Sequence, residues 1–332
     1  MNRVKEVNRV YLITVIVAVL GSFVMSVFEP LIKNYFFALM FSQVLLIIPM
    51  LFYIIITKQN ILEVIRLKKI KTVNMFLAIV FAFLITPLMT LLNLISLLFS
   101  TNVIDDTVTN VVENNPLFLS LFIIAFIPCI FEEAVYRGVF FHEYRKVNPL
   151  KAVVLSGLLF GLLHMNFNQF IYAFAMGVVF AVMIEATDSI LTTMIIHFTI
   201  NGSSVVMTYM MPRIEDLIRI TYGNVKAAEL FPDTVEYTAS TLIPLIISYA
   251  FIATFTTVLA VLLMILMSKI QGRWDGFKFI FRKQERNQDV LTEGIEGSSI
   301  GQINHKIGSL SLLIGIVICV IIMIWIEVTT RM

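Results

Sequence analysis

PLFLSLFIIAFIPCIFEEAVYRGVFF, residues 116–141, is the stretch that decides the fold class. Apart from Glu132, Glu133 and Arg137, it contains no charged residue. A helix needs about 20 mostly apolar residues to cross a hydrocarbon core of about 30 Å. The stretch is therefore expected to span a membrane and to carry three charged side chains with it. Charged residues in such a position are rare and tend to be functional, because they are costly to bury.

The whole chain has the composition of a membrane protein. It is 59% hydrophobic and 14% charged, whereas soluble domains are about 45–50% apolar and about 25% charged. Its two cysteines, Cys129 and Cys319, both lie in apolar blocks, so neither a disulfide framework nor a cysteine-based zinc site is expected. This composition excludes a water-soluble fold and predicts an all-α, polytopic transmembrane helix bundle.

Apolar length predicts about nine spans, of which the fifth is short. The predicted ranges are 10–28, 35–57, 73–100, 116–141, 150–164, 169–186, 189–211, 241–267 and 307–328. They divide the chain into an N-terminal region of three spans (1–110), a core of four spans (111–211) and a C-terminal region of two spans (212–332). The last region also contains an outer and a cytoplasmic connecting segment.

Positive charge gives the predicted orientation. Lys and Arg accumulate on cytoplasmic segments, and 19 of the 24 Lys and Arg residues fall on alternate segments of the nine-span topology. The N-terminus is therefore expected in the cytoplasm and the C-terminus outside. Frequent Ile, Lys and Asn favour a bacterial source and hence the plasma membrane. Nucleic acid is not an expected partner.

Helical spacing separates the two adjacent glutamates. They lie about 100° apart around a helix axis, so they are not expected to serve the same partner. Glu133 precedes Arg137 by four residues, which is the favourable order for an ion pair within a helix. Glu132 has no such partner. We expect it to face the interior of the bundle, where it could act as a general base.

Three further polar residues are expected at the depth of Glu132. At about 1.5 Å per helical residue, Glu132, His164, His197 and Asn201 all lie roughly 13–21 Å from the cytoplasmic ends of their helices. Glu132 and His164 could activate a water molecule. His197 and Asn201, one helical turn apart, could stabilise an oxyanion. This site requires no cofactor, although zinc bound by His164, His197 and Glu132 stays an alternative.

Three motifs carry a resemblance to a known family. EEAVYR, FGLLH and HFTIN resemble the motifs EExxxR, FxxxH and HxxxN of the CPBP family of CAAX proteases and bacteriocin-processing (Abi) enzymes, which is related to the type II CAAX prenyl endopeptidase. The resemblance implies a membrane-embedded endopeptidase with Glu132, His164, His197 and Asn201 as catalytic residues and with Glu133 and Arg137 in support. The family has been described both as glutamate-dependent and as metallopeptidases. The absence of a standard zinc spacing favours the first description here.

Other functions and roles stay open at this point. The same fold could serve as a non-proteolytic bacteriocin-immunity or scaffold protein, and intramembrane charges also occur in transporters. A protease would take a peptide or a membrane protein as its substrate, with the lipid bilayer as its surroundings. Glu185 is expected to reach the cytoplasmic interface or to cap a neighbouring helix, and Phe160 is expected to be a packing residue.

Overall fold

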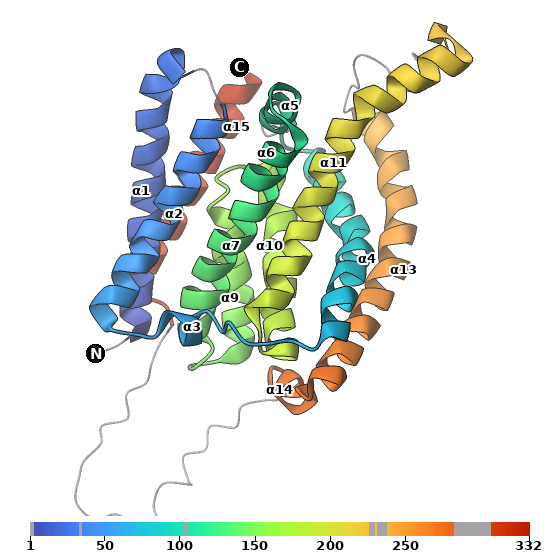
Figure 1. The fold of residues 1–332 in the computed structure, drawn as a ribbon. Helices are drawn as coiled ribbons and strands as arrows, with labels where there is room; N and C mark the ends of the chain where they lie inside the picture. Colours follow the sequence, from blue (N-terminus) through green and yellow to red (C-terminus); the bar gives the residue numbers. More distant parts are fainter. Residues whose placement is uncertain (1–2, 33–34, 103–104, 226–229, 231–237, 282–306) are drawn as a thin grey trace, which may run out of the picture.

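The computed structural model describes residues 3–32, 35–102, 105–225, 230, 238–281 and 307–332. Over these residues its elements are all helical (Figure 1). Eight helical segments are long and apolar enough to cross a membrane. They are α1 (Arg3–Ile32), α2 (Tyr35–Thr57), α4 (Thr72–Ser96), the composite span Leu117–Tyr144, α10 (Phe167–Thr187), α11 (Ile190–Tyr222), α13 (Ala239–Gln271) and α15 (Leu310–Arg331). The predicted all-α, polytopic membrane fold is confirmed.

The fifth predicted span is a shorter helix. α9 (Pro149–Leu162) has 14 residues, so it is about 21 Å long and falls short of the hydrocarbon thickness. After α9 the chain reverses through Met165, whose φ is 54°. The Asn166 side chain then caps α10 by accepting a hydrogen bond from the Gln169 backbone N–H at 2.8 Å. Within the described residues the full-length spans therefore number eight, and His164 lies in the turn that follows the short helix.

Close backbone contact fixes α9 against α10. A Cβ atom on Gly157 would lie 2.8 Å from the carbonyl oxygen of Phe174, and one on Gly161 would lie 2.9 Å from that of Phe170. Glycines four residues apart allow two helices in a membrane to approach closely. Since His164 follows this glycine pair directly, the packing of α9 on α10 also sets the position of the histidine.

The remaining helices surround this centre. α1 packs against α2 and α15 on one side, and α4 packs against α13 on the other (Figure 1). The fourth predicted span is composite: it comprises α6 (Leu117–Leu121), η1 (Phe122–Phe126), α7 (Ile127–Glu133), η2 (Ala134–Phe140) and α8 (Phe141–Tyr144), in which η1 and η2 are π-helical. The shorter helices are α3 (Ile61–Val64), α5 (Asp105–Asn114) and α14 (Trp274–Phe279).

Basic segments from distant parts of the chain meet at the end of the bundle where the N-terminus lies (Figure 1). Arg66 and Arg145 contact Glu185 at 2.9 and 2.5 Å. Lys68 contacts Asp188 at 2.7 Å. Glu185, the weakest of the sequence candidates, thus belongs to an ion-pair network that ties the α3–α4 connection to the α10–α11 turn. The assignment of this end to the cytoplasm stays a prediction.

Asp188 lies in that turn, between two spans, with a left-handed φ of 56°, which Asp tolerates better than most residues. Burial alone would raise its pKa. The hydrogen bond from Lys68, together with the charges of Arg66 and Arg273, outweighs burial and holds the pKa of Asp188 below its ordinary value of 3.8. The carboxylate is therefore ionised in the folded protein at neutral pH.

The seventh span is longer than its sequence suggests. A polar outer connection was expected from residue 212 onward, yet α11 continues past Pro212 to Tyr222, and this extension projects beyond the other helices (Figure 1). Arg219 pairs with Glu215 at 2.5 Å on its exposed surface. Residues 226–229 and 231–237 of the predicted outer connection lie outside the described residues. So do residues 282–306, which make up most of the predicted cytoplasmic segment 269–306.

Candidate active site

A proline breaks the regular hydrogen bonding of the fourth span above the glutamates. Pro128 has no N–H, so the carbonyl oxygen of Ile124, four residues earlier, loses its helical donor. The preceding turn is π-helical, and the Ile127 N–H bonds to Phe122 O, five residues back. The side-chain amide of Asn201 on α11 donates to Ile124 O at 3.2 Å. Asn201 therefore satisfies the orphaned carbonyl with one N–H, and its second N–H is available for another acceptor.

The ion pair between Glu133 and Arg137 that the sequence predicts is present in the structure. Glu133 Oε1 lies 3.0 Å from Arg137 Nη1, and neither side chain is exposed. The guanidinium carbon also lies 4.5 Å from the ring centroid of Phe160 and 5.0 Å from that of Phe180. Contact with two aromatic rings offsets part of the cost of burying this cation. Phe160, itself buried, is a packing residue at the centre of the site.

His197 lies between the two glutamates. Its Nδ1 is 3.2 Å from Glu133 Oε1 and its Nε2 is 3.8 Å from Glu132 Oε2. Because an ionised carboxylate only accepts, Nδ1 carries the hydrogen in the bond to Glu133. The expectation that the two glutamates serve different partners is thus wrong for His197. An imidazole has a nitrogen on each side of its ring and can bridge carboxylates that point in different directions.

Glu132 also has a partner that the sequence prediction missed. The side-chain amide of Gln43, on α2, donates to Glu132 Oε1 at 3.0 Å. Gln43 interrupts an otherwise apolar span, and a polar residue inside such a span is a signal that could have identified it. Its contact with Glu132 depends on the packing of α2 against α7, which the sequence of either helix does not reveal.

His164 is oriented by its own helix. Its Nδ1 lies 2.8 Å from the carbonyl oxygen of Phe160, and a carbonyl only accepts, so Nδ1 carries the hydrogen. In the neutral imidazole, Nε2 then has the free lone pair. The His164 ring packs against Phe160, with ring centroids 5.0 Å apart. The centroid of the His197 ring lies 6.2 Å from that of Phe160. His164 thus presents a basic nitrogen near the same aromatic ring.

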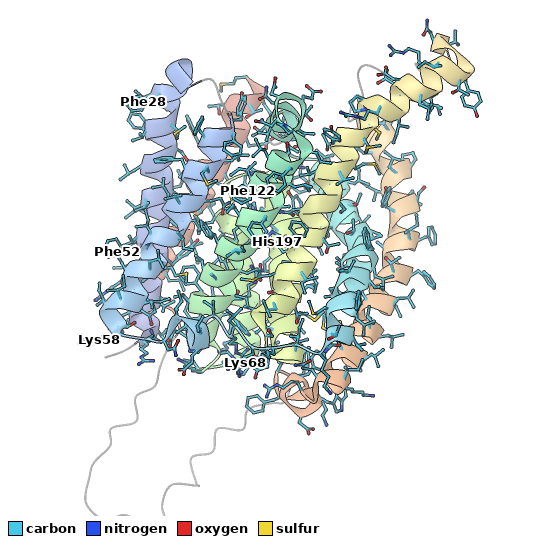
Figure 2. All side chains as sticks on the ribbon, viewed as in Figure 1. Phe28, Phe52, Lys58, Lys68, Phe122 and His197 are labelled. Carbon is cyan, nitrogen blue, oxygen red and sulfur yellow. The ribbon has the colours of Figure 1, made fainter. Side chains whose placement is uncertain are left out.

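Exposure divides the site into a closed rear and a more open front. The side chains of Glu133 and Arg137 are 0% exposed and that of His197 is 1% exposed, whereas Glu132 is 14% exposed. His164 and Asn201 are likewise only partly buried. Figure 2 shows His197 midway along the bundle, far from Lys58 and Lys68 at its basic end. Glu132 is therefore the most exposed of the four ionisable side chains Glu132, Glu133, Arg137 and His197.

The zinc alternative concerns His164, His197 and Glu132. Among the described residues, no group of three or more His, Cys, Asp and Glu side chains is placed to hold a metal ion. A zinc ion needs its nitrogen and oxygen ligands at about 2.0–2.2 Å. His164 and His197 each direct Nδ1 to another acceptor, which leaves Nε2 as the ring nitrogen that could bind a metal. We derive no step through a metal.

Comparison with known proteins agrees with the motifs. Residues 114–203 match the sequence model of the family described as type II CAAX prenyl endopeptidase Rce1-like. No curated protein and no solved structure matches the chain. The chain therefore carries an Rce1-like segment, and the resemblance drawn from the three motifs is confirmed.

This segment includes the composite span, α9, α10 and the first part of α11. Together with the eight apolar helices, the match supports an integral membrane protein of the CAAX-type protease class in general. It covers less than a third of the chain, and Gln43 lies outside it.

Proposed function

We propose that this chain is an intramembrane endopeptidase that hydrolyses a peptide bond with water activated by Glu132 and His164. The observation that carries the proposal is the convergence of Glu132, Glu133, His197 and Arg137, from two spans, on one layer within the bundle. Buried ionisable groups in a membrane are costly and mark functional sites. The match of residues 114–203 to the Rce1-like family supports the same conclusion.

In the proposed reaction, Glu132 or His164 Nε2 removes a proton from water as its oxygen attacks the peptide carbonyl carbon. The carbonyl oxygen becomes an oxyanion. The second N–H of Asn201 stabilises it, and so does His197 when its ring is protonated and both its nitrogens donate. The proton then passes to the peptide nitrogen and the C–N bond breaks, so that a carboxylate and an amine leave.

Glu133 and Arg137 support this site without touching the substrate. Glu133 fixes the ring of His197 through Nδ1, and Arg137 compensates the charge of Glu133. Burial of all three side chains keeps the imidazole orientation constant, which positions Nε2 for its task.

The substrate proposed is a peptide or a membrane protein, either a CAAX-type protein or a bacteriocin or other peptide. It would enter from the cytoplasmic side of a bacterial plasma membrane, where nineteen Lys and Arg residues are predicted.

Mass spectrometry of peptides cleaved from membrane substrates tests the proposal. Purified protein is compared with Glu132→Ala and with the control Glu215→Ala, whose side chain lies on the outer extension of α11. We expect Glu132→Ala to lose at least about 100-fold in cleavage rate, as for removal of a general base, and Glu215→Ala to cleave normally. Equal peptide patterns in all three would overturn the proposal.

The same purified protein also distinguishes the alternative functions. Activity that disappears on chelation and returns with zinc would establish a metallopeptidase in place of the glutamate mechanism. Bacteriocin protection that persists in Glu132→Gln and His164→Ala would establish a binding or immunity protein, and ion-coupled flux with intact peptides would establish a transporter.

A further inference from the structure

Gln43 reaches the candidate site from a helix outside the family match. It lies on α2, which packs against α7, and its Nε2 donates to Glu132 Oε1 at 3.0 Å. Its neighbours on α2, Ser42 and Val44, are exposed on the outer surface of the bundle. Gln43 is thus the polar residue that this part of α2 directs inward.

The hydrogen bond from Gln43 makes the two oxygens of the Glu132 carboxylate unequal. Oε1 is occupied by the amide, whereas Oε2 lies 3.8 Å from His197 Nε2. That separation is too long for a hydrogen bond. Oε2 is therefore the oxygen that remains available to accept a proton from water.

The other end of the Gln43 amide is a buried acceptor. Its Oε1 has no hydrogen-bond partner among the described residues and is closed off from the surface. Buried polar atoms are nearly always paired, and one that is not calls for an explanation. The amide oxygen and nitrogen share one carbon atom, so this acceptor lies beside the carboxylate that the nitrogen binds.

A general base is effective only when its accepting oxygen is held toward the water that it deprotonates. A hydrogen bond to one carboxylate oxygen restricts rotation of the carboxylate and so fixes the direction of the other oxygen.

We infer that Gln43 is a positioning residue for hydrolysis: Nε2 holds Glu132 Oε1, so that Oε2 faces the attacking water. The inference rests on the proposed function of Glu132 as the base. Gln43 thereby fixes the direction in which Glu132 accepts the proton.

The test compares Gln43→Leu with the adjacent control Ser42→Ala in the full-length protein. Leu is similar in size but can neither donate nor accept. We expect Gln43→Leu to lower kcat about 10- to 100-fold with little change in KM, because misplaced reacting groups slow chemistry rather than binding. Ser42→Ala should behave as the unmodified chain.

Thermal stability separates positioning from a purely structural role. Leu in place of Gln43 removes a buried acceptor without a partner but also leaves Glu132 Oε1 without its donor, so the two effects oppose each other and we expect little change in melting temperature. A protein that melts earlier or fails to fold would show that Gln43 serves the fold, and the inference would be wrong. Unchanged kcat would also overturn it.

A second variant, Gln43→Glu, keeps the size of the side chain but replaces the amide donor with a carboxyl group. We expect its kcat at neutral pH to fall at least as far as that of Gln43→Leu, because two neighbouring carboxylates repel. A kcat equal to that of the unmodified chain would contradict the role of Nε2. Full activity in Glu132→Ala would defeat the proposed function itself, whereas an inactive Glu132→Ala beside a fully active Gln43→Leu would defeat only this inference.

Discussion

Removal of Arg137 should destabilise the protein far more than removal of a surface arginine in the same kind of pair. Arg137 and Glu133 are both fully buried, with 3.0 Å between Nη1 and Oε1. Arg137→Met would leave Glu133 charged in a low-dielectric interior with His197 as its remaining partner. Breaking a buried pair in this way costs about 3–5 kcal/mol. The measurement is the fraction of folded protein against SDS in mixed micelles.

Arg219→Met is the matched control. Arg219 and Glu215 have the same four-residue spacing and a shorter separation of 2.5 Å, but their side chains are 50% and 31% exposed. Exposed pairs of this spacing contribute about 0.3–0.5 kcal/mol. From distance alone, Arg219→Met would be expected to lose more stability than Arg137→Met, whereas burial predicts the larger loss for Arg137→Met. The double variant Glu133→Gln, Arg137→Met should recover part of the loss, because it removes both charges. Equal losses in Arg137→Met and Arg219→Met would refute the reasoning.

Three further predictions concern the stability of the fold. Pro128→Ala supplies an N–H for Ile124 O, so Asn201→Ala should cost less stability in the Pro128→Ala background than in the unmodified chain. A double-mutant cycle measures this coupling, and strictly additive losses of stability would contradict the prediction. Asn8 hydrogen-bonds to Tyr144 on α8 and to Ile307 and Ser309 before α15, at 2.6–2.8 Å. Asn8→Leu would leave these groups without a partner, so SDS unfolding should show a loss of about 1–3 kcal/mol in stability. No loss would count against a stabilising role of Asn8. Asp188 has a lowered pKa, so it stabilises the fold above pH 3.8 and ceases to do so as pH falls through its folded pKa; melting between pH 3 and 7 should show a smaller acid-induced loss in Asp188→Asn, and parallel curves would exclude this role.

Much of the fold follows from apolar length, because a bilayer imposes the same minimum on every span. The predicted second span, 35–57, coincides with α2. The fifth differs because its apolar residues 150–164 include a turn that begins after Leu162, and hydropathy does not distinguish an apolar turn from a helix. The extension of α11 was missed for the opposite reason, since a polar sequence can remain helical once it has left the membrane.

The site was predictable in part, for a local reason. The pairing of Glu133 with Arg137 depends only on spacing along one helix, so it could be read from sequence. His197 and Gln43 approach Glu132 from other helices, and such contacts depend on the rotation of each helix about its axis. The π-helical turns around Glu132 also change that rotation, and an assumption of regular helical geometry does not include them.

The hydrogen bond from α2 to Glu132 has a consequence for modularity. The Rce1-like segment begins at residue 114, but the carboxylate it supplies is held by an amide from a helix that ends at Thr57. An isolated segment 114–203 would lack this amide and would turn that face of α7 toward lipid. In our proposal the functional unit is therefore larger than the unit of sequence similarity, and an exchange of N-terminal helices would have to preserve the donor at position 43.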